Sequence, residues 1–110
     1  MQLFIAVLTE GTYVPTILKK FADNNFHGSV LSTKSIKHAL MDSVEPEPYF
    51  GGLNMVVDGE TEVMRPMIFV VCKDEEVKIL SSLVIQAVDG LKGKGFMYSM
   101  PINYIEGLED

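Results

Sequence analysis

The segment at positions 90–95, GLKGKG, combines glycines and lysines in a pattern that could hold a phosphate group. Glycine allows the backbone to approach phosphate oxygens closely, and the ammonium group of Lys94 would add a positive charge. The segment is not a P-loop, because it lacks GKS or GKT and precedes an expected strand instead of a helix. The residues alone therefore leave two alternatives: an anion-binding turn, or a plain mobile connection into the last strand.

The other residues that could take part in catalysis or metal binding form no recognisable catalytic arrangement. His27 lies at an expected helix–strand junction and His38 in a long connection, and neither has a signature of a nucleophile or base around it. His38 and Asp42 could bind a metal at helical spacing, although we favour solvated surface groups. Cys72, the only cysteine, ends an apolar run and is expected to be a small buried hydrophobe. We therefore expect no catalytic residues and no enzymatic activity.

The composition argues against several classes of protein. The 110 residues include 15 acidic and nine basic ones, for a net charge of −6, whereas a nucleic-acid-binding face needs clustered basic residues. No apolar stretch approaches the roughly 18 residues that a membrane span requires. The first residues contain neither a basic region nor a small-residue cleavage site, so we expect no signal peptide. Together with the single cysteine, these features indicate a reducing, cytoplasmic setting.

Two similar units of secondary structure must position these residues. Apolar runs predict four strands, over 2–9, 27–35, 65–72 and 95–102. Apolar residues at helical spacing predict two helices, over 11–25 and 73–90. The order β-α-β-β-α-β is typical of the α+β, ferredoxin-like split βαβ sandwich, a four-stranded antiparallel sheet with two helices on one face. We expect a single domain over 1–110, with a long flexible loop at about 36–62.

The second predicted helix has signals at both ends. Asp74 is expected to cap its amino terminus, and Gly90 suits the left-handed residue that often ends a helix.

The predicted strands suggest that the chain does not act alone. They are apolar at successive positions, as in FIAVL and MIFVV, so both faces of the sheet require burial. Two helices on one face leave the other face uncovered. Another copy of the chain is the simplest cover, and we predict a homo-oligomer.

In residues 67–102 a strand, an acidic helix start, an apolar helix and a glycine-rich segment follow one another. In this order of segments, most of the chain resembles the PII-like signal proteins of the nitrogen-regulatory superfamily. Gly93-Lys94-Gly95-Phe96 stands where those proteins have Gly-Asp-Gly-Lys, and the closing strand has the same proline, Pro101. The segment NNFHGSVLST, residues 24–33, is similar to the cyclic-di-AMP receptor branch of the superfamily.

This resemblance implies a non-enzymatic regulatory protein that forms a homotrimer with its sheets facing inward. A small anionic ligand, ATP, ADP or cyclic-di-AMP, would bind in clefts between neighbouring subunits, and loop 36–62 would signal to a target protein. The implied binding residues are one group from the second strand and one from the glycine-rich turn: Ser29, Ser32, Thr33 and Lys34, with Gly93, Lys94 and Gly95.

Two departures from the superfamily pattern leave a second hypothesis open. Phe96 replaces the superfamily's lysine while Lys94 stands at its aspartate position, so the charge has moved. The basic residues expected after the last strand are absent, because the tail NYIEGLED offers only acids. The alternative is a metal-binding or constitutive assembly trimer of the copper-tolerance type, which has the same trimeric architecture and would lack a nucleotide response.

Overall fold

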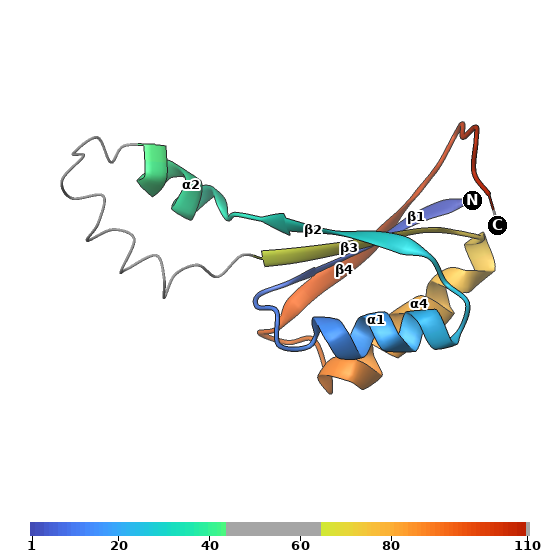
Figure 1. The fold of residues 1–110 in the computed structure, drawn as a ribbon, viewed down its shortest axis with the longest axis horizontal. Coiled ribbons are helices and arrows are strands. Elements are labelled where there is room, and N and C mark those ends of the chain that lie inside the picture. The colour runs from blue at the N-terminus through green and yellow to red at the C-terminus, as the bar shows by residue number, and fades with distance from the viewer. Residues whose placement is uncertain (44–64, 110) are drawn as a thin grey trace.

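The computed structural model describes residues 1–43 and 65–109, which form one four-stranded sheet with two helices packed along it (Figure 1). The strands are β1 (Gln2–Leu8), β2 (Gly28–Thr33), β3 (Arg65–Cys72) and β4 (Gly95–Pro101). The helices are α1 (Val14–Asp23), α2 (Ile36–Ser43) and α4 (Val77–Val88), with the 3₁₀ turn η2 (Asp74–Glu76) directly before α4.

The order of strands in the sheet is β2-β3-β1-β4, and every neighbouring pair is antiparallel. In the middle of the sheet, Ile5 of β1 lies opposite Phe69 of β3 on one side and Tyr98 of β4 on the other. Figure 1 shows α1 and α4 on the same side of this sheet. The strand order and the one-sided helices confirm the predicted ferredoxin-like fold.

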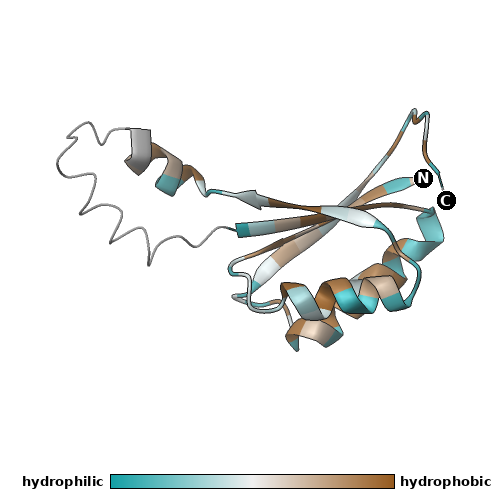
Figure 2. Ribbon diagram, in the orientation of Figure 1, coloured by the Kyte–Doolittle hydropathy of each residue, from teal (hydrophilic) through white to brown (hydrophobic). Residues whose placement is uncertain are grey.

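The hydrophobic core lies between the sheet and these two helices. Successive side chains of a strand point to opposite faces, so every second residue of β1 and β3 meets the helices. Those residues are Phe4, Ala6, Leu8, Ile68, Val70 and Cys72, and all are buried. The helices contribute Ile17, Phe21, Leu80, Val84 and Val88. In Figure 2, hydrophobic and hydrophilic residues alternate along both helices, as expected for helices with one buried side.

The opposite face of the sheet, which we call the open face, is also apolar. Its members are the intervening residues of the strands: Leu3, Ile5, Val7, Ser29, Leu31, Thr33, Met67, Phe69, Val71, Phe96, Tyr98 and Met100. Phe96, Tyr98 and Met100 of the edge strand β4 are 52%, 45% and 43% exposed. Neither α1 nor α4 covers this face (Figure 1).

The expected loop at 36–62 begins with a helix. Ser35 explains where α2 starts, because its Oγ accepts a hydrogen bond from the His38 N–H at 3.2 Å and its carbonyl oxygen accepts one from the Ala39 N–H at 2.9 Å. A serine in this position satisfies an N–H group that the first turn of a helix leaves unpaired. The rest of the expected loop, residues 44–62, lies outside the described residues.

The start of α4 differs from the prediction, whereas its end agrees. The Lys73 N–H donates a hydrogen bond to the Glu76 carboxylate at 2.7 Å, and Asp74 instead pairs with the amino-terminal ammonium group at 3.1 Å. The prediction that Asp74 caps the helix was therefore wrong, because the ammonium group engages its carboxylate and α4 begins after Glu76 without a side-chain cap. After α4, Asp89 and Gly90 both have left-handed backbones, with φ of 57° and 97°, which confirms the predicted helix end.

Candidate functional site

The predicted binding residues lie in two groups at opposite edges of the sheet. The first group, Ser29, Ser32, Thr33 and Lys34, belongs to edge strand β2 or directly follows it. The second group, Gly93, Lys94 and Gly95, forms the turn into edge strand β4. Strands β3 and β1 lie between the groups, which are therefore separated by three strand spacings, or roughly 14 Å. One chain does not bring them together.

Both groups nonetheless lie at the same end of the sheet, except for Ser29. Thr33 at the end of β2 lies opposite Arg65 at the start of β3. Gly95 at the start of β4 lies opposite Leu8 at the end of β1. Ser29 lies toward the other end of β2, four residues before Thr33. We call these two groups, one at each edge, the two partial walls of the predicted site.

The ammonium group of Lys94 is held within its own chain. It donates a hydrogen bond to the carbonyl oxygen of Val88, the last residue of α4, and lies 5.3 Å from the centroid of the Tyr13 ring. A cation at a helix carboxyl terminus is stabilised by the helix dipole, and the aromatic ring adds a cation–π interaction. Lys94 therefore has a structural role, which the sequence did not reveal.

The glycines of this turn also have structural roles. Gly93 has a left-handed φ of 77°, and a Cβ atom at Gly95 would lie only 2.2 Å from the Val7 carbonyl oxygen. The N–H groups of Lys94 and Gly95 both donate to the Leu91 carbonyl oxygen, at 2.8 and 3.2 Å. Two donors that a phosphate-binding turn would use are thus engaged inside the turn. In the isolated chain, these contacts favour the plain connection.

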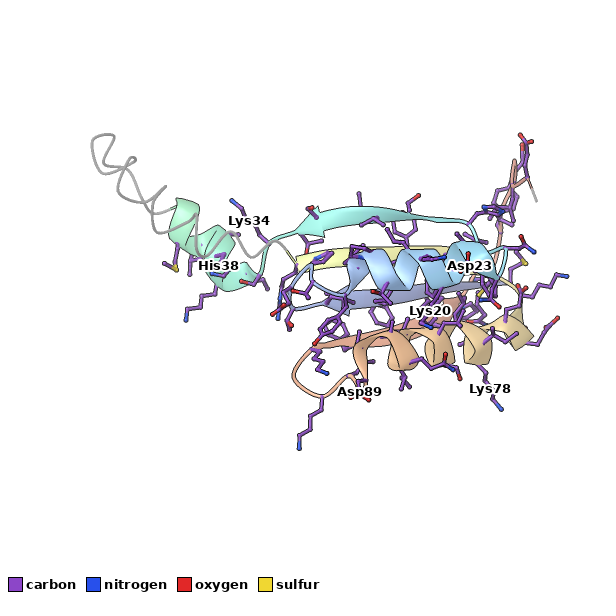
Figure 3. All side chains as sticks on the ribbon, turned by 60° about the horizontal axis from the view of Figure 1, so that its bottom comes forward. Lys20, Asp23, Lys34, His38, Lys78 and Asp89 are labelled. Carbon is purple, nitrogen blue, oxygen red and sulfur yellow. The ribbon has the colours of Figure 1, made fainter. Side chains whose placement is uncertain are left out.

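The residues at the end of β2 support the neighbouring elements. The Thr33 hydroxyl donates a hydrogen bond to the Arg65 carbonyl oxygen at 2.7 Å, which ties β2 to β3. Ser35 Oγ lies 3.1 Å from His38 Nδ1. Figure 3 shows Lys34 and His38 together at the base of α2, away from the layer that contains α1 and α4.

Two cavities flank the beginning of β2, at the end of the sheet opposite the glycine turn. A cleft of about 690 Å³ borders the open face at Phe69 and Val71 and reaches Leu108 of the tail. A smaller cavity of about 240 Å³ lies on the helix side, beside Leu18 and Ile68. Both are bordered by Phe26, His27, Gly28 and Ser29. Ser29 is the predicted site residue that lines them, and sequence periodicity gave no sign of either cavity.

Titratable groups near the larger cleft serve structural roles. Burial raises the pKa of the Cys72 thiol, and the Glu76 carboxylate raises it further, so this cysteine is a poor nucleophile. Hydrogen bonds from the amino-terminal ammonium group and Gln2 lower the pKa of Asp74. Neither group has the environment of a catalytic acid or base.

The described residues were also compared with the requirements of a metal site and of a membrane-spanning helix. Within residues 1–43 and 65–109, no three His, Cys, Asp or Glu residues are grouped so that they could hold a metal ion. The side chain of Asp42, proposed above as a partner of His38, lies outside the described part of the structure. No helix in that part is long and apolar enough to cross a membrane.

Comparisons with known proteins bear on the fold of this chain. No protein-family model matches it, and no curated protein sequence matches it. Among solved structures, it is similar to a functionally unknown protein from Pediococcus pentosaceus ATCC 25745, with a TM-score of 0.62 over 97% of this chain and 96% of that one. The two sequences are 13% identical. The similarity therefore establishes a shared ferredoxin-like, α+β architecture.

Proposed function

We propose that this protein is a non-enzymatic, PII-like regulatory protein that forms a homotrimer and binds a small anionic ligand between its subunits. The open face carries this proposal. Phe96, Tyr98 and Met100 are exposed in succession along one strand, and the rings of Phe96 and Tyr98 stack with their centroids 6.0 Å apart. Monomeric proteins rarely leave a large contiguous apolar surface in water, and burial contributes about 25 cal/mol for each Å² removed from water.

A ring of three copies would also unite the two partial walls. Both walls lie at the same end of the sheet but at opposite edges. When the open faces of successive copies point toward a common axis, the β2 edge of one copy faces the β4 edge of the next. Thr33 and Lys34 would then lie beside the turn at 93–95 of a neighbour. The binding site would be complete only between copies.

Adenine nucleotides and cyclic-di-AMP are the ligands that the superfamily resemblance suggests. In a chain with a net charge of −6, an anion depends on local lysines and backbone N–H groups. Because Val88 and Tyr13 hold Lys94, the exposed Lys92 of the same turn is better suited to meet a phosphate. Lys34 would approach the ligand from the opposite wall.

Helix α2 would transmit the signal to a target protein. It begins two residues after Lys34, and its Ile36, Leu40 and Met41 side chains are exposed, Ile36 by 87%. An eight-residue helix is barely stable in water without packing. A bound anion at Lys34 and a partner protein on these apolar side chains would each stabilise it, so binding of one would favour binding of the other.

Light scattering and a thermal-shift panel test this proposal together. We expect a trimer at micromolar concentration and a rise in melting temperature with ATP, ADP or cyclic-di-AMP, since a ligand at 100 times its Kd stabilises a protein by about 2.7 kcal/mol. Lys92→Ala should abolish the rise, whereas Lys78→Ala, an exposed lysine on α4, should leave it intact. A monomer at this concentration would contradict the proposal.

The engaged N–H groups of Lys94 and Gly95 favour a second candidate, a constitutive trimer of the copper-tolerance type. That protein would assemble through the same open face but would ignore nucleotides. The panel separates the two: a trimer whose melting temperature responds to no nucleotide, or to divalent cations alone, is the second candidate.

A further inference from the structure

A separate candidate binding site is the cleft of about 690 Å³ beside the beginning of β2. Small-molecule sites typically enclose roughly 300–1,000 Å³ and are lined mainly by apolar side chains, with a few polar groups that orient the ligand. The cleft lies at the end of the sheet opposite the turn at 93–95, so it is distinct from the proposed anion site. Residues of a single chain form the cleft, so it requires no second copy.

The walls of the cleft are largely apolar. Phe69 and Val71 of β3 contribute their open-face side chains, Phe26 comes from the segment before β2, and Leu108 belongs to the tail. Although β3 is a central strand, Phe69 and Val71 are only half-buried. Removing their remaining surface from water would favour binding. These walls therefore suit a ligand with a large aliphatic or aromatic group.

The lining of the cleft also carries opposite charges close together in the chain. Lys73 directly follows β3, and Glu76 ends the 3₁₀ turn η2. The Glu76 carboxylate is positioned by the hydrogen bond that it accepts from the Lys73 N–H at 2.7 Å. Neither side chain takes part in an ion pair with another described residue. The cleft thus offers both a cation and an anion to a ligand.

We propose that this cleft binds a free α-amino acid with a large apolar side chain, such as leucine or phenylalanine. The Lys73 ammonium group would meet the carboxylate of the ligand, and the Glu76 carboxylate would meet its ammonium group. Phe69 and Val71 would contact its side chain. Both charges of the ligand and its apolar part would then have a partner in the cleft.

The charges of the cleft favour a zwitterion over other ligands. The phosphates of a nucleotide would face two carboxylates, those of Glu76 and Glu109, and the single lysine of the lining. The amino-terminal ammonium group offers little to an anion, because Asp74 pairs with it at 3.1 Å. A purely cationic ligand would be repelled by Lys73. Only a ligand that carries both charges matches the lining.

Nuclear magnetic resonance titration of the isotope-labelled full chain tests the inference. The probes are leucine and phenylalanine, and the matched controls are glycine, phenylalaninamide and N-acetyl-phenylalanine. Glycine lacks the apolar side chain, and the last two lack the carboxylate and the ammonium charge, respectively. We expect leucine and phenylalanine to shift the amide signals of residues 69–73 and to leave those of 92–95 unchanged. Each control compound should bind more weakly than phenylalanine.

Two variants then identify the charged groups. Glu76→Gln keeps an oxygen for the Lys73 N–H but removes the charge, and Lys73→Gln removes the opposite charge. Each should weaken phenylalanine binding about fivefold, as expected for one solvent-accessible ion pair. Lys73→Gln should not weaken binding of phenylalaninamide, nor Glu76→Gln that of N-acetyl-phenylalanine. Glu75→Gln and Lys78→Gln are the controls, because both residues are exposed and neither lines the cleft.

The inference is overturned if neither amino acid shifts a signal at millimolar concentration, or if the shifts fall outside the cleft. Equal binding of phenylalanine and its two singly charged analogues would also overturn it. The nucleotide response is measured with different ligands and depends on Lys92, so either result can fail without the other.

Discussion

The Lys94 ammonium group lies over the Tyr13 ring, 5.3 Å from its centroid. This contact joins the turn before β4 to the segment before α1, and the same ammonium group binds the Val88 carbonyl oxygen at the end of α4. A lysine that the sequence suggests for ligand binding thus links three parts of the fold. The structural role of Lys94 can be measured as a change in the free energy of unfolding.

We expect Lys94→Ala to lower the free energy of unfolding by about 1 kcal/mol, through loss of a cation–π contact and a helix-dipole interaction. Urea denaturation followed by circular dichroism measures the change. Lys92→Ala removes a charge from the same turn at an exposed position and should change stability by less than about 0.5 kcal/mol. Equal stability of the two variants would show that the Lys94 contacts contribute nothing.

Gly95→Ala should be strongly destabilising. The new Cβ would lie 2.2 Å from the Val7 carbonyl oxygen, and the residue has a φ of 151°, so either β4 must move away from β1 or the backbone must remain strained. We expect a loss of roughly 2 kcal/mol or more. Gly11→Ala is the control, because a Cβ there meets nothing within 4 Å. A melting temperature for Gly95→Ala that matches the control would refute the close approach of the two strands.

A pair of substitutions on α4 compares its two sides. Leu80 is completely buried, whereas its neighbour Ile79 is 47% exposed. We expect Leu80→Ala to cost about 2–5 kcal/mol because it leaves a cavity in the core, and Ile79→Ala to cost less than about 1 kcal/mol. Chemical denaturation of the two variants measures both losses in the free energy of unfolding. The reverse ranking would mean that α4 packs on the sheet through its other side.

Asp74 should contribute to stability in a pH-dependent manner. Its pKa is lowered in the folded state by hydrogen bonds from the amino-terminal ammonium group and Gln2. Its stabilising effect is therefore fully present above the unfolded pKa of about 3.9 and is lost as the pH falls through the lower folded value. Asp74→Asn should accordingly reduce stability at pH 6 and bring it closer to wild type below pH 4.

Urea titrations at several pH values measure this dependence. Glu75→Gln, which alters an adjacent exposed carboxylate, should follow the wild-type pH dependence. If Asp74→Asn also followed the wild-type curve, the ion pair with the amino terminus would be energetically silent.

The sequence predicts the sheet well because its strongest signals are local. The strands β1 and β3 are unbroken apolar runs, and the stripe through Leu80, Val84 and Val88 has helical spacing, so each element was found within a few residues of its bounds. Helix α2 was missed. Its eight residues are too few to establish a helical period. The Ser35 cap precedes a stretch rich in prolines and glycines, which indicated a loop.

The candidate site was harder to predict because it depends on contacts between distant residues. The residue types of the glycine turn suggested phosphate binding, but the partners of Lys94, namely Tyr13 and Val88, follow from how α1 and α4 pack. The separation of Thr33 from Gly95 follows from the order of the strands in the sheet. The sequence pattern of each single strand does not contain that order. Side-chain periodicity cannot supply either relationship.

The strand order also determines how the protein can be made. Strand β1 comes before the other three strands of the sheet in the chain, yet its neighbours are the third and fourth of them. Pairing on its β4 side must therefore wait until residue 101 has been synthesised and has cleared the exit tunnel. Such distant partners slow folding, so one edge of β1 stays unpaired until the end of β4 has emerged. Premature termination before residue 95 would leave β1 permanently without its last neighbour.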